Sequence, residues 1–337
     1  MTFLNKNNWP LEHWHIEISG KCPIKCPRCT RQELPGFVNS ELSLDWFIEN
    51  FTPIVSHVKK VTFCGDDGDP IYAKDLIQVI AWLKKQNKDI QIVVITNGSY
   101  KTSKWWKELD SYLDIGDHIH FSIDGWDQES NNLYRVNCDW KSIMQGANEV
   151  KNAIKTWAAI AFKFNETKLS DMKIMAKELN FDYFQLTYSS KFGVNYQAYP
   201  KDDPLQPSSK FVSTDRFKRT IEHISERQWN DKLVTESYSE KFDKMQDTEI
   251  KPLCWIGNKG LYVNSVGKFF PCCWTGLRYS HTANLFPYID YSKTFIDVVD
   301  DTSWTALFNS FSDNTCPSEC KSKCGKHLWS YEHATQW

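Results

Sequence analysis

The sequence predicts an α/β fold, and two of its features support that prediction. From residue 13 to about residue 190, short runs of strand-forming residues alternate with longer segments whose apolar residues recur at helical spacing. This alternation is typical of repeated strand–helix units around a parallel sheet. The chain has 337 residues, of which 41% are hydrophobic and 15% aromatic, so it can also bury a large core.

Six strands and five helices account for the alternation. The strands are expected at His15–Ser19, Lys60–Cys64, Ile90–Thr96, His118–Ile123, Trp157–Phe164 and Tyr183–Thr187. The helices are expected at Leu44–Val58, Lys74–Gln86, Ser103–Leu113, Trp140–Lys155 and Leu169–Leu179, with Ser43 and Ser103 as N-caps. Six units are too few to close an eight-stranded barrel, so a partial barrel and an open doubly wound sheet both fit. Both architectures place function on the loops that follow the strands.

The composition changes after the sixth strand. Residues 201–251 are rich in charged and polar residues, include closely spaced prolines, and contain an expected helix at Thr214–Arg227. From residue 252 cysteines occur again, among short strand-like pieces, and this pattern predicts a small domain that bound metal holds together. The expected division is therefore a core at 13–200, a bridging segment at 201–251 and a cysteine-rich domain at 252–337.

Charge and composition exclude some classes of protein. The formal net charge of -2 is spread along the chain, so the basic stripe typical of nucleic-acid binding is missing and a nucleic-acid partner is not expected. The first ten residues lack the apolar core of a signal peptide, and no apolar run reaches membrane-spanning length. We therefore expect a cytoplasmic protein. In that reducing compartment, eleven cysteines are expected to serve as metal ligands rather than disulfides.

Three of these cysteines lie within eight residues, in the segment Cys22-Pro-Ile-Lys-Cys26-Pro-Arg-Cys29. One loop can wrap such a triplet around a [4Fe–4S] cluster, and three protein ligands leave the fourth iron open. An open iron can chelate the amino and carboxylate groups of a methionine moiety. A structural zinc site would need a fourth ligand, and none follows Cys29 at a finger-like spacing.

The spacing Cys-x3-Cys-x2-Cys directly after a first strand resembles the signature of the radical S-adenosylmethionine (SAM) superfamily, whose core is a partial (β/α)6 barrel. Further segments resemble that family's motifs in the same order. They are Gly68-Asp69-Pro70, Thr96-Asn97-Gly98, Ser122-Ile123-Asp124-Gly125 with Tyr134-Arg135, and Asn165-Glu166. The resemblance covers residues 13 to about 190 and implies that Gly68, Asp69, Pro70, Asn97, Ser122, Asp124, Arg135 and Asn165 bind SAM. Two departures are Asp69, where the family has Glu, and Arg28, where it usually has an aromatic residue.

A second group of cysteines lies near the C-terminus. Cys254, Gly267 and Cys272 resemble the opening Cys-x9–15-Gly-x4-Cys of the SPASM or twitch extension found in many radical SAM enzymes. This resemblance implies one auxiliary [4Fe–4S] cluster held by Cys254, Cys272 and two of Cys316, Cys320 and Cys324. A zinc site is the alternative, because four sulfur ligands suit either metal.

Two further residues follow strands and have two interpretations each. Cys64 ends the second strand, where its thiol is either a hydrogen-atom donor to a radical or a small core residue. Tyr188 follows the sixth strand and either lines a substrate cavity or packs in the core. Cys138 lies in a polar loop, where a surface thiol is expected.

The sequence thus predicts an enzyme that cleaves SAM reductively to a 5'-deoxyadenosyl radical, which takes a hydrogen atom from a substrate. The family resemblance implies a peptide or small-metabolite substrate and an external one-electron donor such as flavodoxin or ferredoxin. The reaction class (peptide modification or small-molecule oxidation, epimerisation or dehydrogenation) stays open. The alternative is a non-catalytic iron–sulfur or zinc protein that uses its cysteines for structure or electron transfer.

Overall fold

The computed structural model describes residues 12–33, 37–189, 203–212, 219–227, 250, 261–279, 286–299 and 303–324. Over these residues the chain forms a nine-stranded sheet in the order β7-β6-β5-β4-β3-β2-β1-β8-β9. The first six strands are parallel to their neighbours: β1 (His13–Ile16), β2 (Lys60–Phe63), β3 (Gln91–Thr96), β4 (His118–Ser122), β5 (Ile154–Ile160) and β6 (Tyr183–Thr187). Because the order of these six strands never reverses, they form the singly wound, barrel-like arrangement and not a doubly wound one. The predicted partial barrel is confirmed.

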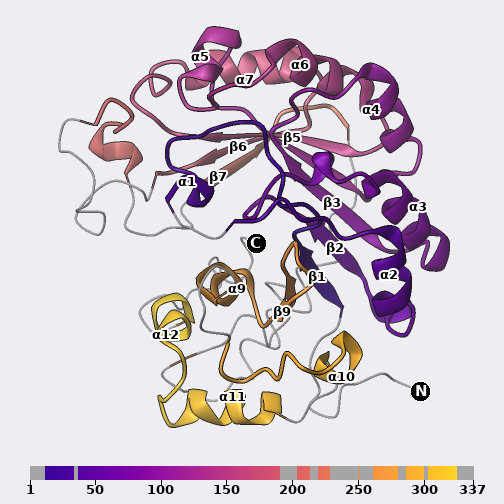
Figure 1. Cartoon of the computed structure of the whole chain (residues 1–337). Helices are drawn as coiled ribbons and strands as arrows, with labels where there is room; N and C mark the ends of the chain where they lie inside the picture. The colour runs from indigo at the N-terminus through magenta and orange to yellow at the C-terminus, as the bar shows by residue number, and fades with distance from the viewer. Residues whose placement is uncertain are drawn as a thin grey trace.

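Helices follow these strands in the chain. They are α2 (Leu44–Phe51), α3 (Leu76–Gln86), α4 (Ser103–Asp110), the short α5 (Gln128–Asn132), α6 (Trp140–Glu149) and α7 (Leu169–Glu178). Figure 1 shows them in an arc around the outside of the sheet. The Ser43 hydroxyl caps α2 as predicted, because it accepts from the Trp46 amide at 3.2 Å. The cap of α4 is Thr102 rather than Ser103, since Ser103 is already the first helical residue.

The sheet has one apolar and one polar face. Alternate residues of a strand point to opposite faces, so Trp14 and Phe121 face the helices while His15 and His120 face inward. On the helix side the Trp14 ring lies 5.0 Å from the Phe51 ring of α2, between centroids. The apolar outer face packs the helices and leaves the inner face free for polar chemistry.

The core sheet is extended at both edges. At one edge β7 (Arg219–His223) pairs antiparallel with β6. The expected helix over Thr214–Arg227 is therefore wrong: the free backbone groups of the β6 edge offer a ladder of hydrogen bonds that outweighs local helix propensity. At the other edge β8 (Leu261–Val263) pairs parallel with β1, and β9 (Phe269–Phe270) pairs antiparallel with β8.

The described residues of the cysteine-rich C-terminal part add four helices below the β1 edge in Figure 1: α9 (Cys273–Tyr279), α10 (Phe295–Val299), α11 (Ser303–Ser312) and α12 (Ser318–Cys324). Phe295 of α10 stacks on Phe51 with 5.7 Å between ring centroids, so this part packs on the same aromatic core as α2. The remaining short elements are α1 (Thr30–Glu33), η1 (Val55–His57), η2 (Pro70–Tyr72) and η3 (Ser209–Phe211). Among the described residues, no helix is both long and apolar enough to cross a membrane.

Candidate active site

The cysteine triplet lies in the loop after β1, as the sequence predicts. Cys26 is buried, and Cys22 and Cys29 are partly buried. The Arg31 guanidinium donates to the carbonyl oxygens of Gly20 at 2.8 Å and Cys22 at 3.1 Å, which closes the loop on itself. Arg31 is therefore a structural residue of this loop rather than a solvated side chain.

The thiol chemistry of this loop fits a cationic metal cluster. Burial raises the pKa of Cys22 to about 12 and also raises the pKa of Cys26, so neither thiol ionises near neutral pH unless a cation takes the place of its proton. Within the described part of the chain, the only group of three ligand-type atoms within 4.8 Å of one another is His15, Glu17 and Cys64. The triplet is thus spread more widely than a single zinc ion requires, since thiolates on one zinc lie about 3.8 Å apart.

Asp69 joins the loops after β1, β2 and β3. Its amide donates to the Lys21 carbonyl at 2.9 Å, next to the first cysteine. Its carboxylate accepts from the Thr96 hydroxyl at 2.8 Å and from the Asn97 amide at 2.7 Å. Burial raises the pKa of Asp69 to about 6. The shorter Asp side chain, one departure from the family motif, thus still reaches the turn after β3.

Asn97 contacts both Asp69 and the cysteine loop. Its side-chain nitrogen lies 3.7 Å from the Cys22 sulfur and also donates to the Asp69 carboxylate. Gly68 lies so close to the cysteine loop that a Cβ there would be 2.2 Å from the Ser19 carbonyl oxygen. The predicted residues Gly68, Asp69 and Asn97 are therefore brought together beside Cys22.

The loop after β4 approaches the triplet from its other side. The Arg135 Nε lies 2.6 Å from the Asp124 carboxylate, which is fully buried. Arg135 also donates to Cys26, and its positive charge opposes the burial that raises the pKa of that thiol. The Lys25 amide donates to the Val136 carbonyl at 2.9 Å, so backbone contacts hold the two loops in register.

Asn165 and Ser122 occupy different environments. Asn165 is buried, and its side-chain amide donates to the Asp124 carbonyl at 2.8 Å and to the Ile160 carbonyl at 2.9 Å. These bonds connect Asn165 to the loop after β4 at Asp124 and hold that loop in place. Ser122 lies partly exposed at the end of β4, on the inner face. SAM contact by either residue stays a prediction.

Cys64 and Tyr188 do not lie together. Cys64 follows β2 and is buried, whereas Tyr188 follows β6 and packs with its ring 6.0 Å from that of Phe211. Three strands of the sheet separate β2 from β6. A catalytic role for either residue stays a prediction. Cys138 is buried rather than on the surface, because the Asn131 amide donates to its sulfur at 3.3 Å.

Of the auxiliary ligands predicted, Cys254 lies outside the described residues. Cys272 immediately precedes α9, and Cys316, Cys320 and Cys324 lie just before and within α12. A hydrogen bond from Cys320 lowers the pKa of Cys316, so these two sulfurs are neighbours. Two of the proposed ligands therefore already lie close together, and a shared metal there stays a prediction.

Two groups of polar residues have neighbours that the sequence did not predict. Arg28, noted only as a departure from the family pattern, forms a buried ion pair with Asp203. On the inner face, His118 and His120 lie with ring centroids 6.0 Å apart. Burial lowers the pKa of His120 to about 3, and nearby positive groups contribute, Arg219 among them. Alternation along β4 places the two histidines on one face, but only strand pairing brings Arg219 near.

Comparison with known proteins finds a match between part of this chain and one family. Residues 16–177 match the sequence model of the Radical SAM superfamily. Among solved structures, the chain is similar to SuiB of Streptococcus suis, with a TM-score of 0.55 and 17% identity over 90% of this chain and 68% of that one. It is also similar to anSMEcpe with bound AdoMet, with a TM-score of 0.51 and 16% identity over 96% of this chain and 88% of that one. No curated protein matches the sequence.

Proposed function

Residues 16–177 of this chain form a radical SAM domain, and we propose that the protein is an enzyme that cleaves SAM reductively at a [4Fe–4S] cluster bound by Cys22, Cys26 and Cys29. The observation that carries this proposal is the convergence of three loops on the triplet. Asn97 reaches the Cys22 sulfur at 3.7 Å, Arg135 hydrogen-bonds to Cys26, and the Asp69 amide is bonded to Lys21.

The chain's own residues bind and orient the reactants. When bound, the cluster supplies one electron to the sulfonium of SAM, which yields methionine and a 5'-deoxyadenosyl radical that takes a hydrogen atom from the substrate. The Asp69 carboxylate ties the Gly68–Pro70 backbone to the turn after β3, and the Asp69 amide ties it to Lys21 of the cysteine loop. That backbone would receive the methionine amino group. The Arg135 guanidinium, fixed by Asp124, supplies the positive charge that the methionine carboxylate requires.

The substrate we propose is a peptide or a small metabolite that meets the inner face of the sheet. The cationic and polar groups there, including His118 and Arg219, favour a substrate with an anionic group. The electron would come from an external donor such as flavodoxin or ferredoxin. We further propose that residues 252–337 form a twitch-like domain with one auxiliary [4Fe–4S] cluster on Cys254, Cys272 and two of Cys316, Cys320 and Cys324. In this division, residues 13–200 are the core and 201–251 the bridge.

Anaerobic reconstitution followed by dithionite and SAM tests the proposal. We expect the wild-type protein to release 5'-deoxyadenosine, measured by liquid chromatography. Cys26→Ala should abolish that release while keeping the auxiliary iron, and Cys138→Ala, which removes a buried thiol that is not a proposed ligand, should keep both. If the wild type binds iron–sulfur clusters but forms no 5'-deoxyadenosine, the chain is a non-catalytic iron–sulfur protein. If it binds zinc and no iron, the cluster assignment itself is wrong.

A further inference from the structure

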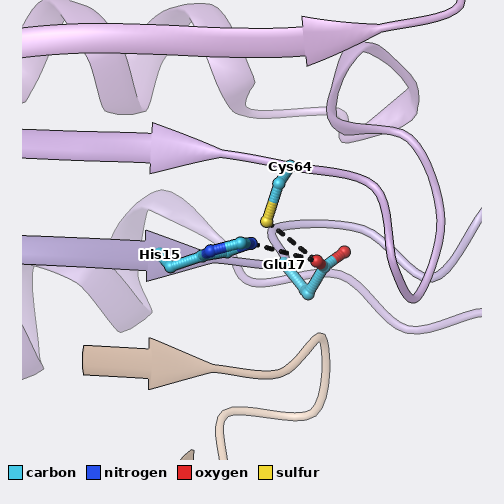
Figure 2. A group of neighbouring side chains, drawn as sticks. All are labelled: His15, Glu17 and Cys64. Carbon is cyan, nitrogen blue, oxygen red and sulfur yellow. Dashed lines mark hydrogen bonds and ion pairs between the residues drawn. The ribbon is translucent and has the colours of Figure 1, made fainter. Parts of the chain in front are cut away.

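A second set of metal-binding side chains lies on the inner face, apart from the cysteine triplet. Figure 2 shows His15, Glu17 and Cys64 pointing toward one another from β1, the residues after it and the end of β2. The His15 Nε2, the Glu17 Oε1 and the Cys64 sulfur all lie within 4.8 Å of one another. Glu17 and Cys64 are buried and His15 is partly buried. From this cluster we infer a site for a zinc ion.

The distances are close to those that zinc requires. The Glu17 Oε1 lies 2.8 Å from the Cys64 sulfur and 3.8 Å from the His15 Nε2. Tetrahedral zinc with Zn–S near 2.3 Å and Zn–O or Zn–N near 2.0 Å sets these ligand separations at about 3.5 and 3.3 Å. The Glu17–Cys64 separation must therefore grow by about 0.7 Å and the Glu17–His15 separation must shrink by about 0.5 Å. The His15–Cys64 separation, which is at most 4.8 Å, must shorten to about 3.5 Å.

The donor set selects the metal. One imidazole nitrogen, one carboxylate oxygen and one thiolate sulfur suit a borderline-soft dication, whereas magnesium and calcium require oxygen ligands throughout. Charge balance agrees with this choice, because a dication with one carboxylate, one thiolate and a neutral histidine leaves the buried site with no net charge. Burial raises the pKa of both the Glu17 carboxyl and the Cys64 thiol, and the protons that they hold pass to solvent when zinc binds.

The Glu17 carboxylate is already oriented for this role. Its Oε1 accepts from the Asp66 amide and its Oε2 from the Asp67 amide, each at 2.9 Å. Such outer contacts fix the direction in which a carboxylate presents its lone pairs to a metal. They also tie the site to the start of the Gly65–Pro70 loop, so an ion here would stiffen the loop that carries Asp69.

An independent sign of a missing ligand is the Tyr262 hydroxyl. Tyr262 on β8 is fully buried, and its hydroxyl has no hydrogen-bond partner. Its ring lies 5.4 Å from that of His15, and the charges of Glu17 and Cys64 contribute to raising its pKa, with burial the larger cause. A buried hydroxyl without a partner costs about 1–3 kcal/mol. A solvent oxygen in the fourth coordination position of the zinc would satisfy it.

The assignment gives Cys64 a role other than hydrogen-atom donation, since a zinc-bound thiolate carries no hydrogen to donate. It is independent of the SAM chemistry, because none of the three ligands belongs to the triplet or to the motifs that approach it. Burial is the largest cause that raises the pKa of Cys64, and Cys273 at the start of α9 makes a smaller contribution. We leave it out of the ligand set, which zinc X-ray absorption can test.

The experiment uses the full chain with its clusters reconstituted, loaded anaerobically with zinc chloride and desalted. We expect the wild type to retain one zinc ion per chain more than Cys64→Ala, with iron unchanged. Cys138→Ala, the matched control, should retain the wild-type amount. The zinc X-ray absorption difference should show one sulfur at about 2.3 Å and nitrogen or oxygen at about 2.0 Å. Equal zinc in wild type and Cys64→Ala, or a shell with two or more sulfurs, would overturn the proposal.

Two conservative variants guard against misfolding. Glu17→Gln keeps one acceptor oxygen, which serves one of the Asp66 and Asp67 amides, and loses the charge. We expect it to lose the extra zinc while its iron content stays near wild type. Tyr262→Phe removes only the hydroxyl, and we expect it to bind zinc about 10-fold more weakly in competition with a chromophoric chelator. Unchanged zinc affinity in both variants would show that the side chains cluster for structural reasons alone.

Discussion

Gly68→Ala tests whether the turn after β2 must press against the cysteine loop. The added Cβ would lie 2.2 Å from the Ser19 carbonyl oxygen, 2.6 Å from the Gly20 carbonyl carbon and 2.7 Å from the Lys21 amide nitrogen. All three are backbone atoms, so no side-chain rotation can relieve the overlap. Ordinary contact begins near 3.4 Å. The two loops must therefore separate by about 1 Å, the difference between that contact and the closest of these three distances.

Both stability and activity should respond. Overpacking of this kind costs about 1–3 kcal/mol, and a 1 Å misplacement of reacting groups can cost about 100-fold in rate. We therefore expect Gly68→Ala to lower the melting temperature and to slow formation of 5'-deoxyadenosine by about 100-fold. The separation would also break the hydrogen bond from the Asp69 amide to Lys21, so weaker SAM binding should appear in calorimetry.

The matched control is Gly116→Ala. There a Cβ would meet only the Asp114 side chain, at 3.3 Å, in a turn far along the chain from the cysteine loop. This variant should behave as wild type in melting temperature, SAM affinity and 5'-deoxyadenosine formation. If Gly68→Ala is indistinguishable from Gly116→Ala, the turn does not contact the cluster loop as described.

Three further variants test other parts of the structure. Arg135→Gln removes the ion-pair partner of the buried Asp124 carboxylate and should lower the free energy of unfolding by about 3 kcal/mol in urea titrations. Adding Asp124→Asn to the same chain should restore part of that loss. Simple additivity of the two substitutions would contradict the pairing. Burial lowers the pKa of Lys155 to about 8 from 10.5, so the unfolded chain binds more protons between those pH values. Stability relative to Lys155→Met should therefore rise by up to about 3 kcal/mol from pH 8 to 10.5, and a constant difference would refute the shift. Gly276→Ala places a Cβ 2.2 Å from the Tyr262 ring, so thermal scans should show a lower melting temperature. An unchanged melting temperature would show that α9 does not pack on β8 at this position.

Most of the prediction for the strand–helix core rests on the periodicity of apolar residues in the sequence. The alternation that predicted a strand at His15–Ser19, which overlaps β1 (His13–Ile16), and the helical spacing of α3 are local features, because each depends on a few neighbouring residues of the chain. The triplet Cys22, Cys26 and Cys29 is local in the same sense, since eight residues are enough to define it. For these reasons the sheet of six parallel strands and the proposed cluster loop could be predicted without coordinates.

Other features depend on pairing between distant segments. The local pattern around Arg219–His223 predicted a helix, and the segment became a strand because the β6 edge was available to it. Likewise Arg28 and Asp203 are far apart in sequence, so their buried ion pair could not be read from either neighbourhood.

By itself, the sequence determined the strand–helix alternation, the cysteine triplet and the order of the motifs that follow it, because each of these depends on the spacing of residues that are close together in the chain. Only the tertiary structure decided that Glu17 meets Cys64, whose sulfur lies 2.8 Å from its carboxylate. Forty-seven residues separate them in the chain. Their meeting depends on the register that pairs Ile16 with Phe63, and register is set by the packing of whole strands.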